Sequence, residues 1–245
     1  MSPEWINYVS KKRQKVLLQI LEELSLLQDK KELNFIIIGA LPLLINGYLN
    51  YKVYWDIDLL FKDRQSLQEF ISEPKPDSLR IVDYDEHLMV NKNISSLHTA
   101  WSFNKTWFNV DYIIKERRYF EFYTWKKENL KFYRESVLFN NREFRIDIYL
   151  ANPWDIIIDK ITSPRTARDI ELKVEFSVDI RHIFAIYQKE KNNEKFWRYV
   201  FRKAAFFEKE QTFKKKFFKI LSLAPELGYE QIKISDEVLK KLGQK

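Results

Sequence analysis

The sequence predicts an α/β unit followed by an all-helical unit, divided near residue 150. A β-branched run at Phe35–Ile38 stops at a glycine, as a buried strand does before a turn. Short apolar segments separated by turn residues then fill residues 79–149, which is the pattern of several strands. After Pro153 the apolar periodicity becomes helical and stays so. We therefore expect an N-terminal helix with an α/β domain in residues 1–150, and a helical domain in residues 151–245.

Composition excludes several classes of protein and site. The 245 residues are 45% hydrophobic and 16% aromatic, which is typical of a packed globular chain. The absence of cysteine excludes a disulfide framework, a thiolate zinc site and a cysteine nucleophile. The three histidines are scattered, without metal-ligand spacing. No secretory signal and no apolar run of membrane length is evident, so we expect a cytoplasmic protein without a membrane partner.

The elements follow from periodicity and from start and stop signals. A first helix is predicted from Ser2 to Lys31, because Ser2-Pro3 resembles a helix start and an apolar stripe follows. The predicted strands are Asn34–Ile38, Val53–Phe61, Arg80–Tyr84, Leu88–Asn91, His98–Phe103, Trp107–Ile114, Phe120–Tyr123 and Arg142–Tyr149. The other predicted helices are Arg64–Ser72, Trp154–Ser163, Val174–Glu190, Asn193–Glu208, Gln211–Ser222 and Asp236–Leu242.

Two carboxylates in the second predicted strand carry the chemistry. Asp56 and Asp58 are two residues apart, so in a strand their side chains point to the same side. Like charges at that spacing repel unless a cation lies between them. Mg²⁺ suits such oxygen ligands, because it binds one or two carboxylates and completes its shell with substrate phosphates. The pair therefore predicts a magnesium site.

A third carboxylate is needed to complete a two-metal cluster. Asp111 interrupts an otherwise apolar strand, where a lone carboxylate requires a reason. Asp147 also lies in a predicted strand and is the alternative, although it directly precedes the Pro153 segment and fits the domain junction. Two Mg²⁺ ions held by Asp56, Asp58 and Asp111 would orient a nucleoside triphosphate and stabilise charge on the transferring phosphorus.

Gly39 stands where the first strand meets a helix. A glycine there lets backbone amides approach a phosphate, and a helix start favours an anion. We expect Gly39 and Ala40 to contact the nucleotide. The alternative is an ordinary strand-to-helix turn.

The order of strand, Gly39-Ala40, helix and Asp56-x-Asp58 resembles the nucleotidyltransferase superfamily that includes DNA polymerase beta. More narrowly, it is similar to the AbiEii family of nucleotidyltransferase toxins. Two later segments, PWDIIIDKI at 153–161 and VDIRHI at 178–183, continue the resemblance in the same order. The resemblance implies a mixed sheet with flanking helices followed by a helical domain. It also implies Mg²⁺-dependent transfer of a nucleoside monophosphate from a triphosphate to an acceptor hydroxyl.

The resemblance also implies roles for later residues. Lys160 and Asp179 fall on the family's functional lysine and helical aspartate. As a point cation Lys160 would neutralise triphosphate charge, and Asp179 would orient it or act on the acceptor; a salt bridge between the two is compatible with this. Arg165 and Arg168, expected in a loop, would reach phosphate or RNA, or simply be solvated. Ala40 departs from the family's second glycine or small polar residue, so only backbone amides remain to bind phosphate there.

The positive charge is concentrated in one region. The chain has a net charge of +7, and residues 189–219 hold eleven Lys or Arg against four Glu. Aromatic residues are interleaved with these charges; most are expected in a core, but basic helices with aromatics also hold phosphates and stack bases. This favours an RNA acceptor.

From the family resemblance the leading acceptor is the 3′ end of a tRNA. The same resemblance implies a toxin of a toxin–antitoxin or phage-defence pair, with an antitoxin protein as partner. The alternatives are transfer to a small molecule, as in aminoglycoside-modifying relatives, transfer to a protein, or a non-catalytic nucleic-acid-binding protein of the same fold.

Overall fold

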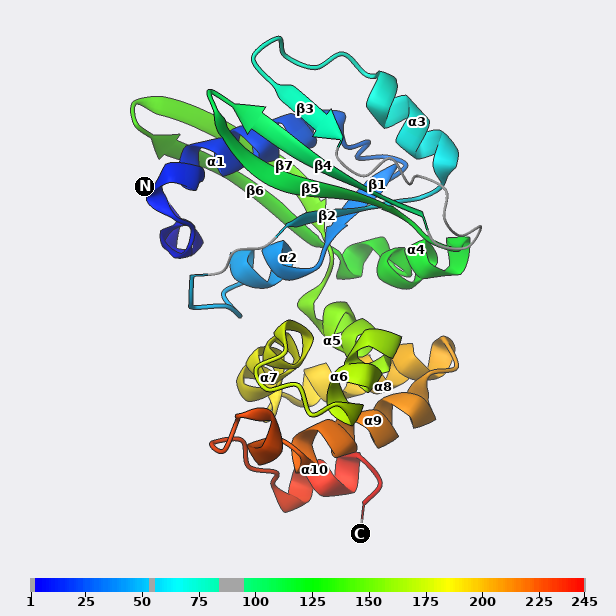
Figure 1. Ribbon diagram of the computed structural model, residues 1–245. Coiled ribbons are helices and arrows are strands. Elements are labelled where there is room, and N and C mark those ends of the chain that lie inside the picture. Colours follow the sequence, from blue (N-terminus) through cyan, green and yellow to red (C-terminus); the bar gives the residue numbers. More distant parts are fainter. Residues whose placement is uncertain (1–2, 53–55, 84–94, 245) are drawn as a thin grey trace. The chain divides into compact units, whose positions relative to one another are not determined.

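The computed structural model describes residues 3–52, 56–83 and 95–244, and the chain divides into two compact units, 1–152 and 153–245 (Figure 1). Across those described ranges, every helix is too short or too polar to cross a bilayer.

The first unit is built on a seven-stranded mixed sheet. Its strands are β1 (Phe35–Ile38), β2 (Ile57–Phe61), β3 (Arg80–Asp83), β4 (Ser95–Phe103), β5 (Thr106–Ile114), β6 (Lys131–Phe139) and β7 (Arg142–Leu150). Its helices are η1 (Glu4–Tyr8), α1 (Lys11–Leu27), α2 (Ala40–Ile45), α3 (Arg64–Ser72), α4 (Arg117–Thr124) and η2 (Lys127–Asn129). The strand order is β3-β4-β5-β2-β1-β7-β6, in which β2–β5 and β1–β7 are parallel pairs and the others are antiparallel. The predicted mixed sheet with flanking helices is confirmed.

An aromatic cluster covers one face of this sheet. Phe70 of α3 packs against Phe35, Phe61 and Tyr112, with ring centroids 5.1–5.5 Å apart. The strand register puts Phe35 and Phe61 on the same face as Ile37 and Leu59, whereas Asp58 points to the opposite face. Figure 1 shows α1 and α3 on one side of the sheet, and α2 and α4 on the other. The sheet therefore has one face buried by α1 and α3 and a second face that carries polar side chains.

The predicted N-terminal helix is two separate pieces. The 3-10 helix η1 ends at Tyr8, and α1 starts at Lys11 after Ser10 in the N-cap position. Trp5 of η1 is buried and donates its indole N–H to the Tyr133 hydroxyl of β6 at 3.0 Å, so this segment docks on the sheet. The predicted start at Ser2 lies outside the described residues.

One predicted strand is wrong, and one strand was missed. The predicted strand Phe120–Tyr123 is part of helix α4, because its aromatics turn inward at helical spacing and Arg117 pairs with Glu121 one turn later at 2.9 Å. β6 was not predicted from the sequence, because its residues, KFYRESVLF, do not alternate between apolar and polar and only Val137 among them is buried. The predicted strand Leu88–Asn91 and residues 53–55 of the second one lie outside the described residues.

The second unit is helical, as predicted. It contains α5 (Pro153–Thr162), α6 (Pro164–Glu171), α7 (Val178–Glu190), α8 (Glu194–Phe206), α9 (Glu210–Ser222), η3 (Pro225–Leu227) and α10 (Asp236–Lys241). Helix α6 was not predicted from the sequence. Arg165 and Arg168 were expected in a loop, and this prediction is wrong because both residues lie in α6. The Ser163-Pro164 pair is a helix-start signal, and the Ser163 hydroxyl indeed accepts from the Thr166 N–H at 3.1 Å.

A buried ion pair joins two of these helices. Lys203 of α8 contacts Asp155 of α5 at 2.7 Å, and both side chains are at most 1% exposed. The Tyr199 hydroxyl donates to the other oxygen of Asp155 at 2.7 Å. Burial raises the pKa of Asp155 to about 6, although Lys203 opposes this rise. The polar cluster therefore belongs to the core of the helical unit.

Candidate functional site

The first part of the candidate site is the contact between Gly39 and Asp58. Gly39 precedes α2 with a φ of 75°, a left-handed conformation that favours glycine. Ile38 and Asp58 are register partners on β1 and β2, so Asp58 lies level with the end of β1. A β-carbon added at Gly39 would lie only 2.0 Å from Asp58 Oδ2. Glycine is therefore required here both by the backbone conformation and by the closeness of the carboxylate.

Three polar side chains form a row across neighbouring strands. Asp58 of β2 pairs with Asp111 of the parallel strand β5, and Asp111 pairs with His98 of β4. Register partners share a face, and neighbouring strands are about 4.8 Å apart. His98 Nδ1 lies 2.9 Å from Asp111 Oδ1. The side chain of Asp111 is 11% exposed and that of His98 is 38% exposed, while Asp58 is half-buried, so the most buried carboxylate lies in the middle of the row.

Asp56 is placed differently from the prediction. Strand β2 begins at Ile57, so Asp56 lies just before the strand and is exposed. In the described part of the chain, no three acidic or histidine side chains are grouped closely enough to hold a metal ion by themselves. The predicted three-carboxylate cluster is therefore represented by the pair Asp58 and Asp111.

The residues present fit a hard divalent cation that also binds a phosphate. Asp58 and Asp111 offer carboxylate oxygens from adjacent strands, and Gly39 leaves room beside Asp58 that a β-carbon would fill. Mg²⁺ in proteins is commonly held by one or two carboxylates, with waters and substrate phosphates as its other ligands. This donor set suits such a site better than a soft metal, which prefers thiolate or imidazole.

The alternative third carboxylate, Asp147, lies elsewhere on the sheet. Its carboxylate accepts from Arg134 of β6 at 2.9 Å, and its backbone N–H donates to Ser25 Oγ at 3.0 Å. Ile37 pairs with Leu150, so Asp147 lies level with the beginning of β1, whereas Asp58 lies level with its end. Of the two candidates, only Asp111 is a neighbour of Asp58.

A second polar group lies wholly in the helical unit. Lys160 of α5 forms a close ion pair with Asp179 Oδ1 of α7, and Arg165 of α6 lies 3.6 Å from Asp179 Oδ2. Burial alone would raise the pKa of Asp179, but Lys160 and Arg165 outweigh it and hold that pKa below its ordinary value. The salt bridge considered from the sequence is thus present. Two cations share one carboxylate, so the group keeps a positive charge that suits an anion.

Arg165 and Arg168 are both exposed on helix α6. Arg165 takes part in the Asp179 group, with 66% of its side chain exposed. Arg168 lies one turn away on the same helix. Both guanidinium groups therefore face solvent, where a phosphate can reach them.

His182 lies beneath this group on α7. It is 2% exposed, and neither of its ring nitrogens has a hydrogen-bond partner in the described structure. Burial and the nearby charge of Lys160 together lower the pKa of His182 to about 3, although Asp179 opposes this shift. The imidazole is therefore neutral at physiological pH.

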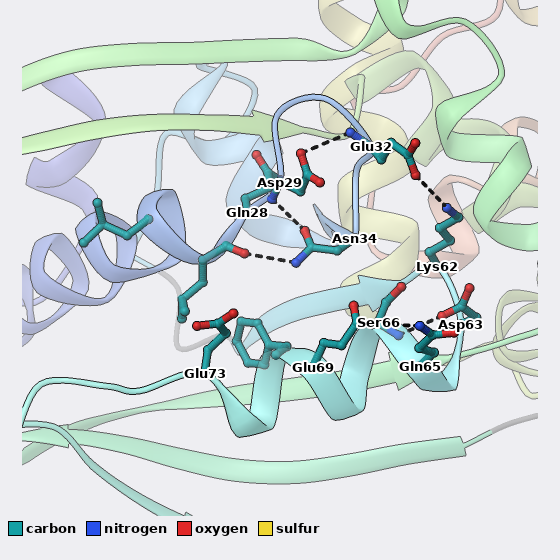
Figure 2. Close-up of a pocket in the computed structure, with 13 residues that line it drawn as sticks. Gln28, Asp29, Glu32, Asn34, Lys62, Asp63, Gln65, Ser66, Glu69 and Glu73 are labelled. Atoms are coloured by element: carbon teal, nitrogen blue, oxygen red, sulfur yellow. Dashed lines mark hydrogen bonds and ion pairs between the residues drawn. The ribbon is translucent and has the colours of Figure 1, made fainter.

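A separate cavity of about 550 Å³ lies at the other end of the β1–β2 pair (Figure 2). Asn34 and Lys62, which flank the start of β1 and the end of β2, line it together with α1 and α3. Its charged lining is mostly acidic and consists of Asp29, Glu32, Lys62, Asp63, Glu69 and Glu73. Lys62 is itself 3.8 Å from Glu32. This charge disfavours a triphosphate, so the cavity is no alternative to the Asp58 site.

Comparison with known proteins gives little beyond this geometry. No protein-family model and no curated protein sequence matches the chain. Two solved structures from Helicobacter pylori are similar to the chain, each at 14% identity and a TM-score of 0.41. The first is a provisionally named nucleotidyltransferase, and the match covers 99% of this chain and 93% of that one. The second is the protein JHP933, and the match covers 96% of this chain and 90% of that one. So distant a likeness leaves the function to be argued from the site itself.

Sequence reasoning missed two histidines near these groups. His98 was passed over because it has no metal-ligand partner along the chain; its contact with Asp111 depends on the pairing of β4 with β5. The available signal was that His98 stands in a predicted strand, where alternate residues share a face. His182 follows Asp179 by three residues on one helix, a spacing that places the two on the same side.

Proposed function

We propose that the chain is a Mg²⁺-dependent nucleotidyltransferase that moves a nucleoside monophosphate from a triphosphate to an acceptor hydroxyl. The observation that carries this proposal is the register of Asp58 with Asp111 on adjacent parallel strands, with the backbone of Gly39 against Asp58. Asp111 is buried and Asp58 is half-buried, and like charges in register on adjacent strands cost stability unless a cation compensates them. A cation held there, with phosphate oxygens completing its shell, removes that cost.

In the proposed reaction the acceptor oxygen bonds to the α-phosphorus, the bond to the β-phosphate oxygen breaks, and pyrophosphate leaves. Asp58 and Asp111 would hold Mg²⁺, which when bound supplies charge stabilisation at the phosphates. His98 would orient Asp111, and Asp56, exposed just before β2, would add a further carboxylate. Gly39 and Ala40 would contribute backbone amides to phosphate binding. The hydroxyl proton would pass to solvent.

The helical unit contributes cations in this proposal. Lys160, Arg165 and Arg168 would bind phosphate groups, and Asp179 would hold Lys160 and Arg165 in position between turnovers. An anionic ligand would compete with Asp179 for these cations. An anion bound there would thereby loosen the ion pair.

RNA is the proposed acceptor, with the 3′ end of a tRNA as the leading candidate. The concentration of positive charge in residues 189–219 supports a polyanionic acceptor, and the motif resemblance supports tRNA. Because the triphosphate and RNA are cytoplasmic, we place the reaction in the cytoplasm. We further propose that the activity is that of a toxin countered by an antitoxin protein, so induced expression should arrest bacterial growth and Asp58→Asn should relieve the arrest.

Transfer is tested with purified protein, each α-labelled nucleoside triphosphate in turn, total RNA and Mg²⁺. We expect label in RNA that chelation abolishes, and a loss of about 100-fold or more in Asp58→Asn and Asp111→Asn, equivalent to about 2.7 kcal/mol of transition-state stabilisation. Asp147→Asn is the matched control, since it neutralises a carboxylate elsewhere on the same sheet. Equal activity in all three variants would overturn the assignment. If label enters only a small molecule or a protein, that molecule is the acceptor and RNA is not. Triphosphate binding without any transfer would indicate a non-catalytic protein.

A further inference from the structure

Helix α8 presents a basic stripe on the side opposite its buried face. Phe196, Trp197, Val200, Lys203 and Ala204 are buried and define the inward face. Lys195, Arg198, Arg202 and Phe206 are exposed and recur every three or four residues, so they lie along one outward line. We call these four residues the α8 stripe.

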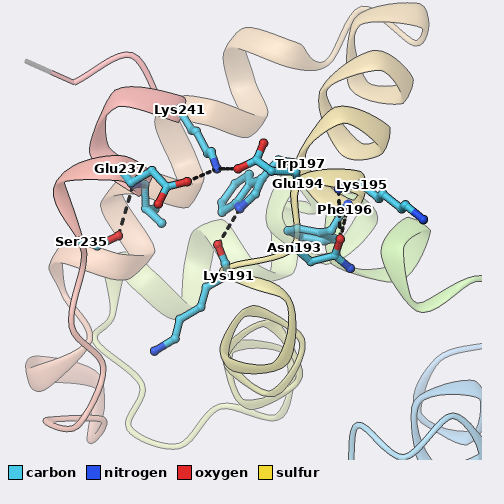
Figure 3. Close-up of polar contacts among 10 residues, drawn as sticks. Lys191, Asn193, Glu194, Lys195, Phe196, Trp197, Ser235, Glu237 and Lys241 are labelled. Carbon is cyan, nitrogen blue, oxygen red and sulfur yellow. Dashed lines mark hydrogen bonds and ion pairs between the residues drawn. The ribbon is translucent and has the colours of Figure 1, made fainter.

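The charge of this stripe is not balanced by α8 itself. The acidic residue on α8 is Glu194, which forms a close ion pair with Lys241, and Lys241 also contacts Glu237 at 2.6 Å. Figure 3 shows this Glu194–Lys241–Glu237 group, with the Lys195 ammonium extending away from it. Lys195 and Arg198 form no ion pair with another described residue. Their charges are therefore available to a polyanion.

The spacing of the cations suits a chain of phosphates. A helix rises about 1.5 Å per residue, so Lys195 and Arg198 are about 4.5 Å apart along the axis, and Arg198 and Arg202 about 6 Å. One nucleotide of a stacked strand rises about 3.4 Å. Successive cations along the stripe are thus one to two nucleotides apart.

An exposed aromatic ring ends the stripe. Phe206 is 61% exposed, and its position is supported by an edge contact with Phe207, whose ring centroid is 5.1 Å away. An apolar ring held in solvent beside cations is a stacking platform for an unpaired base. A base inside a duplex is already stacked on its neighbours and cannot use such a platform.

We propose that the α8 stripe binds single-stranded RNA, with phosphates on Lys195, Arg198 and Arg202 and an unpaired base on Phe206. The stripe would hold an unpaired segment of the RNA acceptor, so this inference rests on the proposed function for the choice of RNA. Its binding chemistry is separate from the transfer chemistry. It is therefore tested with protein that cannot transfer.

The test uses the full chain carrying Asp58→Asn and a fluorescein-labelled mixed-sequence RNA of about 12 nucleotides, a length within the site sizes of single-strand binders. Binding is followed by anisotropy at several salt concentrations. Each neutralised phosphate contact contributes about 0.7 to the slope of log K against log salt for a single strand. Lys195→Gln/Arg198→Gln should therefore lower that slope by about 1.4. Phe206→Leu should weaken binding about tenfold without changing the slope, because it removes stacking and no charge.

The matched control is Lys215→Gln/Lys219→Gln, which removes two exposed charges from α9. An equal slope change in this control would show a general charge effect and overturn the stripe. Equal affinity for a duplex of the same sequence, tighter binding of single-stranded DNA, or binding of anionic vesicles in place of RNA would also overturn it. Thermal melting of each variant establishes that it is folded.

The outcomes distinguish this inference from the proposed function. If RNA binding depends on the stripe but the wild-type protein labels no RNA, the inference about the stripe holds and the proposed transferase function is wrong. If the wild-type protein labels RNA but the stripe variants bind RNA as tightly as it does, the transferase function holds and the inference about the stripe is wrong.

Discussion

The carboxylate of Asp58 lies against the backbone of Gly39, at the point where β1 ends and α2 begins. The two residues are nineteen positions apart in the chain and meet through the antiparallel pairing of β1 with β2. This contact joins the turn that would face the nucleotide to a carboxylate that would hold its metal ion.

Replacing Gly39 with alanine should destabilise the protein and distort this site. The added β-carbon meets Asp58 Oδ2 and also strains a backbone with a φ of 75°. Gly243→Ala is a close control, because Gly243 has a φ of 74° but nothing within 4 Å of the added carbon. We expect urea unfolding to show about 1 kcal/mol of loss in the control and about 2–4 kcal/mol in Gly39→Ala. Equal losses would mean that Asp58 simply moves aside.

Removing His98 should weaken metal binding. His98 contacts the oxygen of Asp111, and partners of this kind orient a ligating carboxylate. For His98→Ala we expect Mn²⁺, titrated as a spin probe by electron paramagnetic resonance, to bind about 10–100-fold more weakly. Ser102→Ala, on the same face of β4, should bind Mn²⁺ as the wild type does. If His98→Ala binds Mn²⁺ as tightly as the wild type does, His98 does not orient Asp111 for metal binding.

The Asp179 group should make stability depend on pH in acid. The pKa of Asp179 is below its ordinary value of 3.8 in the folded chain, so its contribution is complete above that value and is lost as the pH falls further. Asp179→Asn should lower the free energy of unfolding by about 3 kcal/mol at pH 7, because it leaves Lys160 without its buried partner. The difference from wild type should shrink below about pH 4.

Denaturant unfolding across pH checks this, with Glu175→Gln as an exposed control that changes stability by less than about 0.5 kcal/mol. A difference between wild type and Asp179→Asn that stays constant from pH 7 to pH 3 would contradict the low pKa.

His182 should remain neutral throughout the physiological range. Its pKa of about 3 means that its ring resonances should not shift between pH 5 and 8. His182→Leu identifies these resonances in the NMR spectrum, since only three histidines are present. Because both ring nitrogens lack a hydrogen-bond partner in the described structure, this apolar replacement should leave the free energy of unfolding unchanged or raise it by about 1 kcal/mol. A titration near pH 6.5 would show that the imidazole is hydrated.

Local patterns predicted elements where one signal dominates. The predicted helix Arg64–Ser72 agrees with α3 at both ends, because Asp63 caps it and its apolar face is clear. The pattern misled where aromatic residues alternate: Phe120 and Phe122 resemble a strand, yet tertiary packing turns that segment into helix α4. Helix α6 was missed although Ser163-Pro164 announces its start.

The candidate site was predictable in part. Gly39 and Asp58 were recognised from a strand that ends in glycine and from a carboxylate in an apolar strand, and Asp111 from the same kind of interruption. The partnership of Asp56 with Asp58 stays a prediction, because β2 starts at Ile57 and leaves Asp56 just outside the strand. Strand ends depend on pairing with neighbours, which a single segment does not encode.

The sequence by itself determined that this chain has a mixed α/β unit, a helical unit, and carboxylates inside apolar strands, since side-chain period and turn chemistry are local properties. Only the tertiary structure decided that Asp58 lies beside Asp111, and that His98 completes the row. Those residues come from segments far apart in the chain, and a shift of one residue in either strand pairing would have turned the side chains to the opposite face. The register is set by the packing of the whole sheet, and so is the site.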